Sequence, residues 1–255
     1  MLLSVLSLPF FQFHKGFVRL ALLSIFVFIT FQVKGQMAVK GKILLDENFQ
    51  KYAEYSKDET PHWTDFNVES YVLNDAWKVK AWHGIWKRNA EGVQSTWISG
   101  HGPVLAFEGD FRDVVIEYDF RYHKEEGKKM VCRIMVINFD IYPDAYAGAA
   151  WANANSPERD LGIVLENDLW AKGITKIANQ MCSFNENQWY TMRFEIIGNK
   201  ALVNCNGITL YGTSVKFDIP KKMIALGTSD CPCDIRNFKV YEATPNPKWN
   251  SPSKD

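Results

Sequence analysis

Four polar side chains in the middle of the chain have the types that acid–base catalysis needs, and they are His101, Asp140, Glu166 and Asp168. His101 stands between two glycines, which let the backbone approach a ligand closely. An imidazole can take a proton as a general base, and a carboxylic acid can donate one. The sequence therefore predicts a catalytic set of these four residues. The alternative is that His101 occupies a simple turn, while each carboxylate lies at a solvated strand edge or in a structural ion pair.

Arg133 precedes these carboxylates in a β-rich run from Met130 to Tyr142. Residues two apart on a strand share a face, so we expect Arg133 to lie beside Met135 and Ile137. A guanidinium at that place would bind substrate or stabilise an oxyanion. Paired carboxylates also hold Ca²⁺, so calcium is the cofactor that the pattern allows, although the sequence assigns no residue to a metal.

The sequence has nine tryptophans. Flat aromatic rings stack on the apolar faces of sugar rings, but β-sandwich cores also bury many aromatic side chains. Trp189 begins a strand and is predicted to lie in the core. Four tryptophans stand next to polar or glycine-rich sequence and are predicted to bind a saccharide, and they are Trp82, Trp86, Trp151 and Trp170.

Short strands must position these residues. After Ile43, runs rich in Val, Ile, Phe and Tyr alternate with polar residues, as in 114–122 and 192–196. Gly, Asn, Asp and Pro separate the runs. Asn206 and Gly207 tolerate the positive φ that a tight turn needs, so the runs around them are predicted to form an antiparallel meander.

The pattern predicts an all-β fold, a sandwich of two antiparallel sheets without an amphipathic helix. Residues 36–243 are predicted to form a single domain and residues 244–255 a flexible tail. The runs at 44–49 and 234–241 are expected to pair, which would bring the N- and C-terminal strands together. The segment 143–168 has little periodicity and is predicted to be a long loop over one face.

Residues 1–35 have the pattern of a secretory signal peptide. An uncharged apolar run from Leu20 to Phe31 follows basic residues and precedes a cleavage point between Gly35 and Gln36. A spanning helix needs about 20 apolar residues, and this run has 12. Cleavage is therefore favoured over a membrane anchor. The protein is predicted to be secreted or periplasmic, with no stable membrane anchor after cleavage.

The charge of the chain argues against one class of partner. The chain has 29 basic and 29 acidic residues, and removing residues 1–35 removes three basic residues, which leaves 26 against 29. Proteins that bind nucleic acid carry a positive excess that neutralises phosphates. We therefore expect no nucleic-acid partner.

All the cysteines lie after the predicted leader, where an exported compartment would permit disulfides. An odd number leaves at least one thiol unpaired. We expect one bridge, from Cys182 to Cys231 or Cys233, and the sequence leaves the pairing open. The five cysteines are Cys132, Cys182, Cys205, Cys231 and Cys233.

Five segments between residues 43 and 242 together resemble a known family. They are Asp-Glu-Asn-Phe at 46–49, the run at 111–121, Asn-Gln-Trp-Tyr at 187–190, Asn-Gly at 206–207 and Ile-Arg-Asn-Phe-Lys-Val at 235–240. This order resembles the secreted bacterial 3-keto-disaccharide hydrolase domain family, which has a concanavalin A-like or laminin G-like jelly roll. The resemblance implies a jelly-roll fold, a saccharide ligand and hydrolysis of glycosides oxidised at carbon 3.

A different chemistry on the same fold is excluded by the sequence. Laminarinase-type glucanases share the jelly roll and carry Glu-x-Asp-x-x-Glu on one strand. Here Glu117 and Asp119 are followed by Tyr122 where the second glutamate would stand. A retaining glucanase would therefore lack its acid.

Three functions remain open. The first is a saccharide-active enzyme that uses His101 with the carboxylates to cleave a modified glycoside. The second is a non-catalytic carbohydrate-binding or adhesion module that uses the same face of the fold. The third is a structural envelope protein without a ligand. The first requires His101 to converge with at least two carboxylates.

Overall fold

The computed structural model describes residues 35–55, 70–98, 100–123, 125–142, 146–155, 159–166 and 173–251, with Glu166 described by its backbone alone. The chain divides into two compact units, Met1–Gln36 and Met37–Asp255. The fold reported below is that of the second unit. The predicted signal peptide lies outside the described residues except for Gly35. No helix in the described part of the chain is long and apolar enough to cross a membrane.

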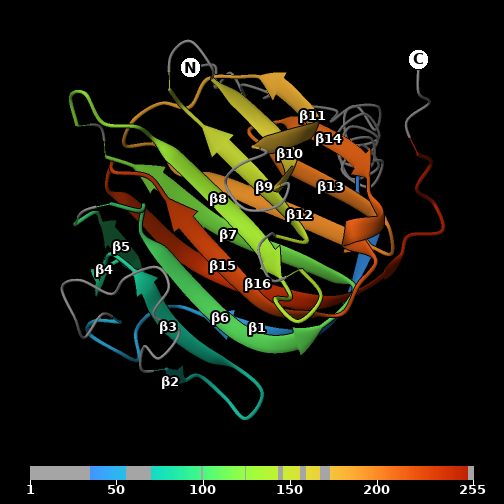
Figure 1. The fold of residues 1–255 in the computed structure, drawn as a ribbon, viewed down its shortest axis with the longest axis horizontal. Helices are drawn as coiled ribbons and strands as arrows, with labels where there is room; N and C mark the ends of the chain where they lie inside the picture. Colours follow the sequence, from blue (N-terminus) through green and yellow to red (C-terminus); the bar gives the residue numbers. More distant parts are fainter. Residues whose placement is uncertain are drawn as a thin grey trace, which may run out of the picture. The chain divides into compact units, whose positions relative to one another are not determined.

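Two antiparallel sheets make up the second unit, and Figure 1 shows them lying one over the other. Sheet A has the order β14-β13-β12-β7-β16-β5-β4, and β1 also pairs with β16. Its strands are β1 (Ala38–Glu47), β4 (Ile85–Arg88), β5 (Val93–Thr96), β7 (Val114–Tyr122), β12 (Tyr190–Ile197), β13 (Lys200–Cys205), β14 (Ile208–Thr213) and β16 (Cys233–Pro245).

Sheet B has the order β11-β10-β9-β8-β15-β6-β3-β2. Its strands are β2 (Tyr71–Val72), β3 (Lys78–His83), β6 (Val104–Phe111), β8 (Val131–Ile137), β9 (Gly148–Asn153), β10 (Asp160–Glu166), β11 (Ile174–Met181) and β15 (Lys221–Thr228). A short 3₁₀ helix, η1 (Val215–Phe217), precedes β15. The predicted all-β sandwich is confirmed.

Alternation of side chains explains why the sheets pack. In β7 the residues that alternate toward the core are buried, while the polar residues between them are half-buried on the outer face. Across the core, the rings of Phe107 and Phe238 stack with centroids 4.3 Å apart. The hydroxyl of Tyr122 donates to the carbonyl of Ala152 at 2.6 Å, which links β7 of sheet A to β9 of sheet B.

The predicted pairing of the two chain ends is confirmed. In the β1–β16 ladder, Leu45 lies opposite Val240 and Glu47 opposite Phe238. The meander β12-β13-β14 is also confirmed, and Asn206 and Gly207 at its second turn have φ of 52° and 76°. These turns follow directly from residues that tolerate positive φ.

The structure differs from three expectations, which concern the loop at 143–168, the C-terminal tail and the disulfide bridge. The segment 143–168 is not one long loop, because it contains the whole of β9 and β10. The predicted tail is partly ordered, because β16 continues to Pro245 and the ring of Trp249 packs against Tyr211 with centroids 5.2 Å apart. All five cysteines are free, so the expected bridge from Cys182 is absent.

Candidate functional site

The outer face of sheet B, which points away from the core, carries four of the nine predicted site residues. The ladders align one row of side chains across five strands, in which Arg133 lies between Gly227 and Trp151. Val104 continues the row beyond Gly227, and Gly162 continues it beyond Trp151. Sequence alternation on β8 predicted this placement of Arg133.

Small residues form the floor of this face. The next row contains Ala106, Ala225 and Ala149, which lie on neighbouring or nearby strands and are buried beneath larger side chains. A second apolar cluster, separate from the sandwich core, surrounds them and includes Trp82 and Met135, with Trp151, Tyr146 and Phe139 packed against it. An aromatic rim around a small-residue floor is a common form of ligand site.

Arg133 is positioned by contacts other than an ion pair. Its guanidinium carbon lies 5.7 Å from the ring centroid of Tyr146. A Cβ added at Gly227 would lie 2.9 Å from Arg133 Nε, so the glycine makes the room that the side chain occupies. Among the described residues, no carboxylate forms an ion pair with Arg133. Its charge is therefore available to a ligand.

Trp151 and Asp160 each hold a buried polar atom without a hydrogen-bond partner in the described part of the chain. The indole of Trp151 lies across Gly162, where an added Cβ would be 2.6 Å from Nε1. Among these residues, that Nε1 has no acceptor and Asp160 Oδ1 has no donor. The other oxygen of Asp160 accepts from Lys176 Nζ at 2.8 Å, and the same ammonium lies 5.2 Å from the Trp151 ring. Buried polar atoms are rarely left unpaired, so this cluster suits a polar ligand.

His101 lies beside the start of β6, close to two other site residues. Its ring centroid is 4.9 Å from that of His83, whose ring in turn stacks against Trp82 at 6.5 Å. Burial lowers the pKa of His101, and the positive charge of Arg133 lowers it further, although a hydrogen bond to the Gly102 carbonyl opposes both. The imidazole is therefore neutral near neutral pH and is able to accept a proton.

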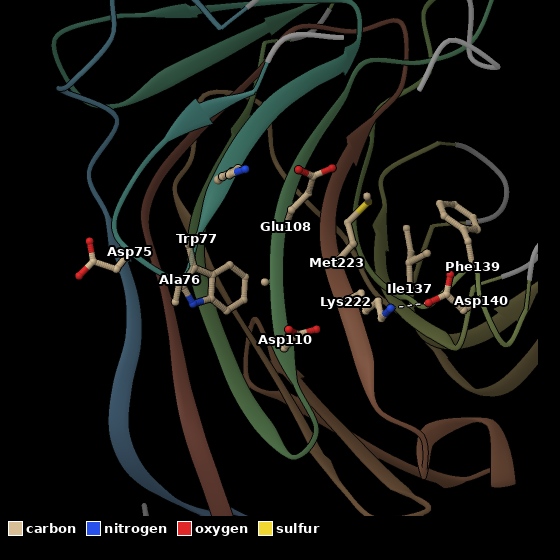
Figure 2. A pocket seen from close by; sticks show the side chains of 12 residues that line it. Asp75, Ala76, Trp77, Glu108, Asp110, Ile137, Phe139, Asp140, Lys222 and Met223 are labelled. Atoms are coloured by element: carbon tan, nitrogen blue, oxygen red, sulfur yellow. Dashed lines mark hydrogen bonds and ion pairs between the residues drawn. The ribbon is translucent and has the colours of Figure 1, made fainter. Parts of the chain in front are cut away.

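A pocket of about 440 Å³ lies at the opposite end of the strands. Figure 2 shows Trp77, Glu108 and Met223 around it, with Asp140 paired to Lys222 at its edge. Glu108 accepts from Lys80 Nζ at 2.6 Å, which places one ion pair between the pocket and the small-residue floor.

The structure brings four predicted site residues to one face: Trp82, His101, Arg133 and Trp151. Asp140 is not among them, because it follows the end of β8 whereas His101 precedes the start of β6, and these two strands run in the same direction. The backbone of Glu166 also lies at the far end, since β10 runs from the row of Asp160 toward it. Asp168 and Trp170 lie outside the described residues.

Trp86 is a correction. It was predicted to bind a saccharide, but it is fully buried in the sandwich core, and its Nε1 donates to the carbonyl of His83 at 3.0 Å. The neighbouring glycine suggested exposure. In fact Gly84, at φ +69°, turns the chain from sheet B into sheet A and directs Trp86 inward.

Sequence reasoning missed Asp160, Lys176 and Tyr146. No local signal marks the first two, because Asp160 and Lys176 lie sixteen residues apart and meet only through the pairing of β10 with β11. In the described part of the chain, no three His, Cys, Asp or Glu side chains gather closely enough to hold a metal ion.

Comparison with known proteins shows the fold. No family model and no curated protein matches the sequence. The carbohydrate-binding module CBM66 from Bacillus subtilis matches 68% of this chain and 100% of its own, at 13% identity and a TM-score of 0.55. A protein of unknown function with a galectin-like fold, also from Bacillus subtilis, matches 82% of this chain and 100% of its own, at 12% identity and a TM-score of 0.54. The chain is thus a jelly-roll β-sandwich.

Proposed function

We propose that the protein binds saccharides on the outer face of sheet B. The observation that carries the proposal is the pair of buried atoms Trp151 Nε1 and Asp160 Oδ1, which have no partner among the described residues. Trp151 lies next to Arg133 in the β8–β9 ladder, and Asp160 lies one row further along the same face. Sugar hydroxyls both donate and accept, so one ring edge can satisfy both atoms. The structural likeness to a carbohydrate-binding module supports this use of the fold.

Binding is tested by isothermal titration calorimetry against a panel of neutral and acidic oligosaccharides. Trp151→Ala is expected to weaken binding at least tenfold, since truncating a central aromatic contact removes about 2 kcal/mol or more. Trp249→Ala is the matched control, because Trp249 is also partly exposed but packs on Tyr211 of sheet A. Equal binding by wild type and Trp151→Ala would place the ligand elsewhere.

Hydrolysis of a 3-keto glycoside is the second candidate. It is favoured by the neutral, partly buried imidazole of His101 beside Arg133. The family resemblance in the sequence supports the same chemistry. Asp140 and the backbone of Glu166 lie at the other end of the strands, so these two residues do not give the convergence with His101 that the enzyme hypothesis requires, and His101 would act without them. Product release from glycosides and 3-keto-glycosides, measured for wild type and His101→Ala, tests it, and equal turnover by the variant would remove His101 from the mechanism.

We also propose that the protein works outside the cytoplasm, as a secreted or periplasmic protein. The apolar run and cleavage point in residues 1–35 support this. Sequencing the N-terminus of protein recovered from its native cells is expected to give Gln36 first. An N-terminus at Met1 would contradict export by cleavage.

A further inference from the structure

The charge distribution on the outer face of sheet B specifies the class of saccharide more closely. Arg112, Arg121, Arg193 and Arg236 each pair with at least one carboxylate. Arg133 does not do so within the described residues, although it is half-buried on the floor of the proposed site. A partly desolvated cation without a counter-ion is costly, and an anionic ligand would offset that cost.

The surroundings hold the guanidinium in place without using its donors. The missing side chain of Gly227 leaves room for Nε on one side, and the ring of Tyr146 lies on another. The planar guanidinium keeps its N–H groups for an acceptor, and its fork matches the two oxygens of a carboxylate. Side chains fixed in this way before binding lose little entropy when the ligand arrives.

Arg133 and Trp151 are direct partners in the β8–β9 ladder, so their side chains stand next to each other on one face. Asp160 belongs to the row beyond, where it lies opposite Asn153. A ligand that bridges these groups needs a negative charge at one end and hydroxyls at the other. A small inorganic anion offers only the first.

We propose that the protein recognises acidic saccharides, with a uronate carboxylate bound by Arg133 and the hydroxyls of the same or the adjoining sugar bound by Trp151 Nε1 and Asp160 Oδ1. This inference rests on the proposed saccharide-binding function and deepens it. It adds that the ligand is negatively charged and that Arg133 binds the charged group.

The test compares matched acidic and neutral ligands. Oligomers of glucuronate, galacturonate, mannuronate and guluronate are titrated calorimetrically into the full chain, each beside its carboxyl-reduced form. At least one uronate oligomer is expected to bind about tenfold more tightly than its reduced form, as charge-assisted hydrogen bonds predict. Arg133→Gln is expected to abolish that preference, so that the uronate oligomer binds the variant no more tightly than its reduced form does.

Two further variants make the result interpretable. Arg133→Lys keeps the charge but loses the fork, so it should retain only part of the preference. Arg112→Gln removes the same charge from an exposed pair with Asp218 and should change nothing. Circular dichroism checks that each variant is folded.

The outcomes separate the two proposals. If reduced oligomers bind as tightly as uronates and Trp151→Ala weakens both, saccharide binding stands and the acidic preference is wrong. If an Arg133→Gln protein keeps the preference, the assignment of Arg133 is wrong. Tighter binding of dextran sulfate than of every uronate would overturn the carboxylate class. If no saccharide in either panel binds, both proposals fail.

Discussion

At the scale of single residues, Lys221 shows how the fold accommodates a buried ammonium that forms no ion pair within the described residues. The side chain is fully buried, and its Nζ donates to the carbonyls of Arg112, Phe217 and Ile219 at 2.9, 2.6 and 3.0 Å. These acceptors come from the turn after β6 and the segment around η1. The ammonium therefore joins two connections that enter β7 and β15. Burial lowers the pKa of Lys221 to about 8.

Replacement of this lysine gives a stability change with a defined dependence on pH. Lys221→Met is expected to cost about 2 kcal/mol at pH 7, because three buried carbonyls lose their donor. The folded-state pKa lies below the unfolded value of 10.5. The unfolded chain therefore binds more protons between about pH 8 and 10.5, and raising the pH through this window stabilises the wild type by up to about 3 kcal/mol.

Urea unfolding followed by tryptophan fluorescence at pH 7 and pH 10 measures both effects. The gap between wild type and Lys221→Met should widen at the higher pH. A gap that stays constant would mean that Lys221 titrates at its ordinary pKa in the folded protein.

Single residues of the site also differ in how well the sequence predicts their positions. Arg133 was placed beside Met135 and Ile137 because strand alternation fixes the direction of a side chain. Trp82 and Trp151 were selected only by the polar or glycine-rich sequence around them. The prediction that Trp86 binds a saccharide was wrong, because the direction of its side chain depends on which sheet the chain enters after Gly84. Asp160 could not be found, since its contact with Lys176 joins residues that are sixteen apart in the sequence.

At the scale of elements, the first strand is fastened by side chains as well as by its ladder. The carboxylate of Glu195, on β12, accepts from the amide of Ala38 at 2.6 Å and from Arg193 Nε at 2.6 Å. Arg193 also binds Glu117 at 2.7 Å, and Glu117 binds Lys40 of β1 at 2.5 Å. The start of β1 is thus tied to both β12 and β7.

Removing Glu195 should release this end of β1. Glu195→Ala is expected to cost about 3 kcal/mol, because it breaks a buried ion pair and leaves the Ala38 amide without its acceptor. Lys239→Ala is the contrast, since its pair with Asp46 is exposed and should cost less than about 1 kcal/mol. Hydrogen exchange should show faster opening of residues 38–47 in Glu195→Ala. Equal stability of the two variants would contradict the role of Glu195 in holding the start of β1.

Elements also explain why the segment 143–168 was misjudged. Its first strand, β9, is built mostly from Gly and Ala, residues without strong strand propensity. These small residues let β9 pack closely in the sandwich. Gly148 shows this, since an added Cβ would lie 2.3 Å from the ring of Phe217. Such tertiary requirements are invisible to local patterns.

At the scale of the whole second unit, the outer faces of the two sheets differ in chemistry. The outer face of sheet A carries a network of ion pairs around the buried Asp234. Its carboxylate accepts from Arg121 and Gln94 and contacts His123 at 2.6 Å. The outer face of sheet B instead offers aromatic rings, small residues and an unpaired guanidinium. The ion pairs of the first face contribute stability, and the second face is the one on which we propose that saccharides bind.

Lowering the pH should therefore reduce the stability of the fold by protonating Asp234 on the outer face of sheet A. Burial raises the pKa of Asp234, but hydrogen bonds from Arg121, His123 and Gln94 outweigh it and leave the pKa below the ordinary 3.8. A lowered folded-state pKa contributes stability above pH 3.8, and this contribution is lost as the pH falls through the folded value. Asp234→Asn should cost about 2 kcal/mol at pH 7 and less at pH 3. Denaturant unfolding at both values checks this, and a cost that does not shrink at pH 3 would contradict it.

The central position of β16 in sheet A affects when the chain can fold during synthesis. This strand is synthesised after every other strand of sheet A, yet it lies inside the sheet between β7 and β5 and also pairs with β1. The pair β4–β5 and the meander β12–β14 can form local hairpins, but β1 has only β16 as its ladder partner. The sandwich therefore closes only after β16 has left the ribosome, and until then apolar surface stays open to proteases and to self-association.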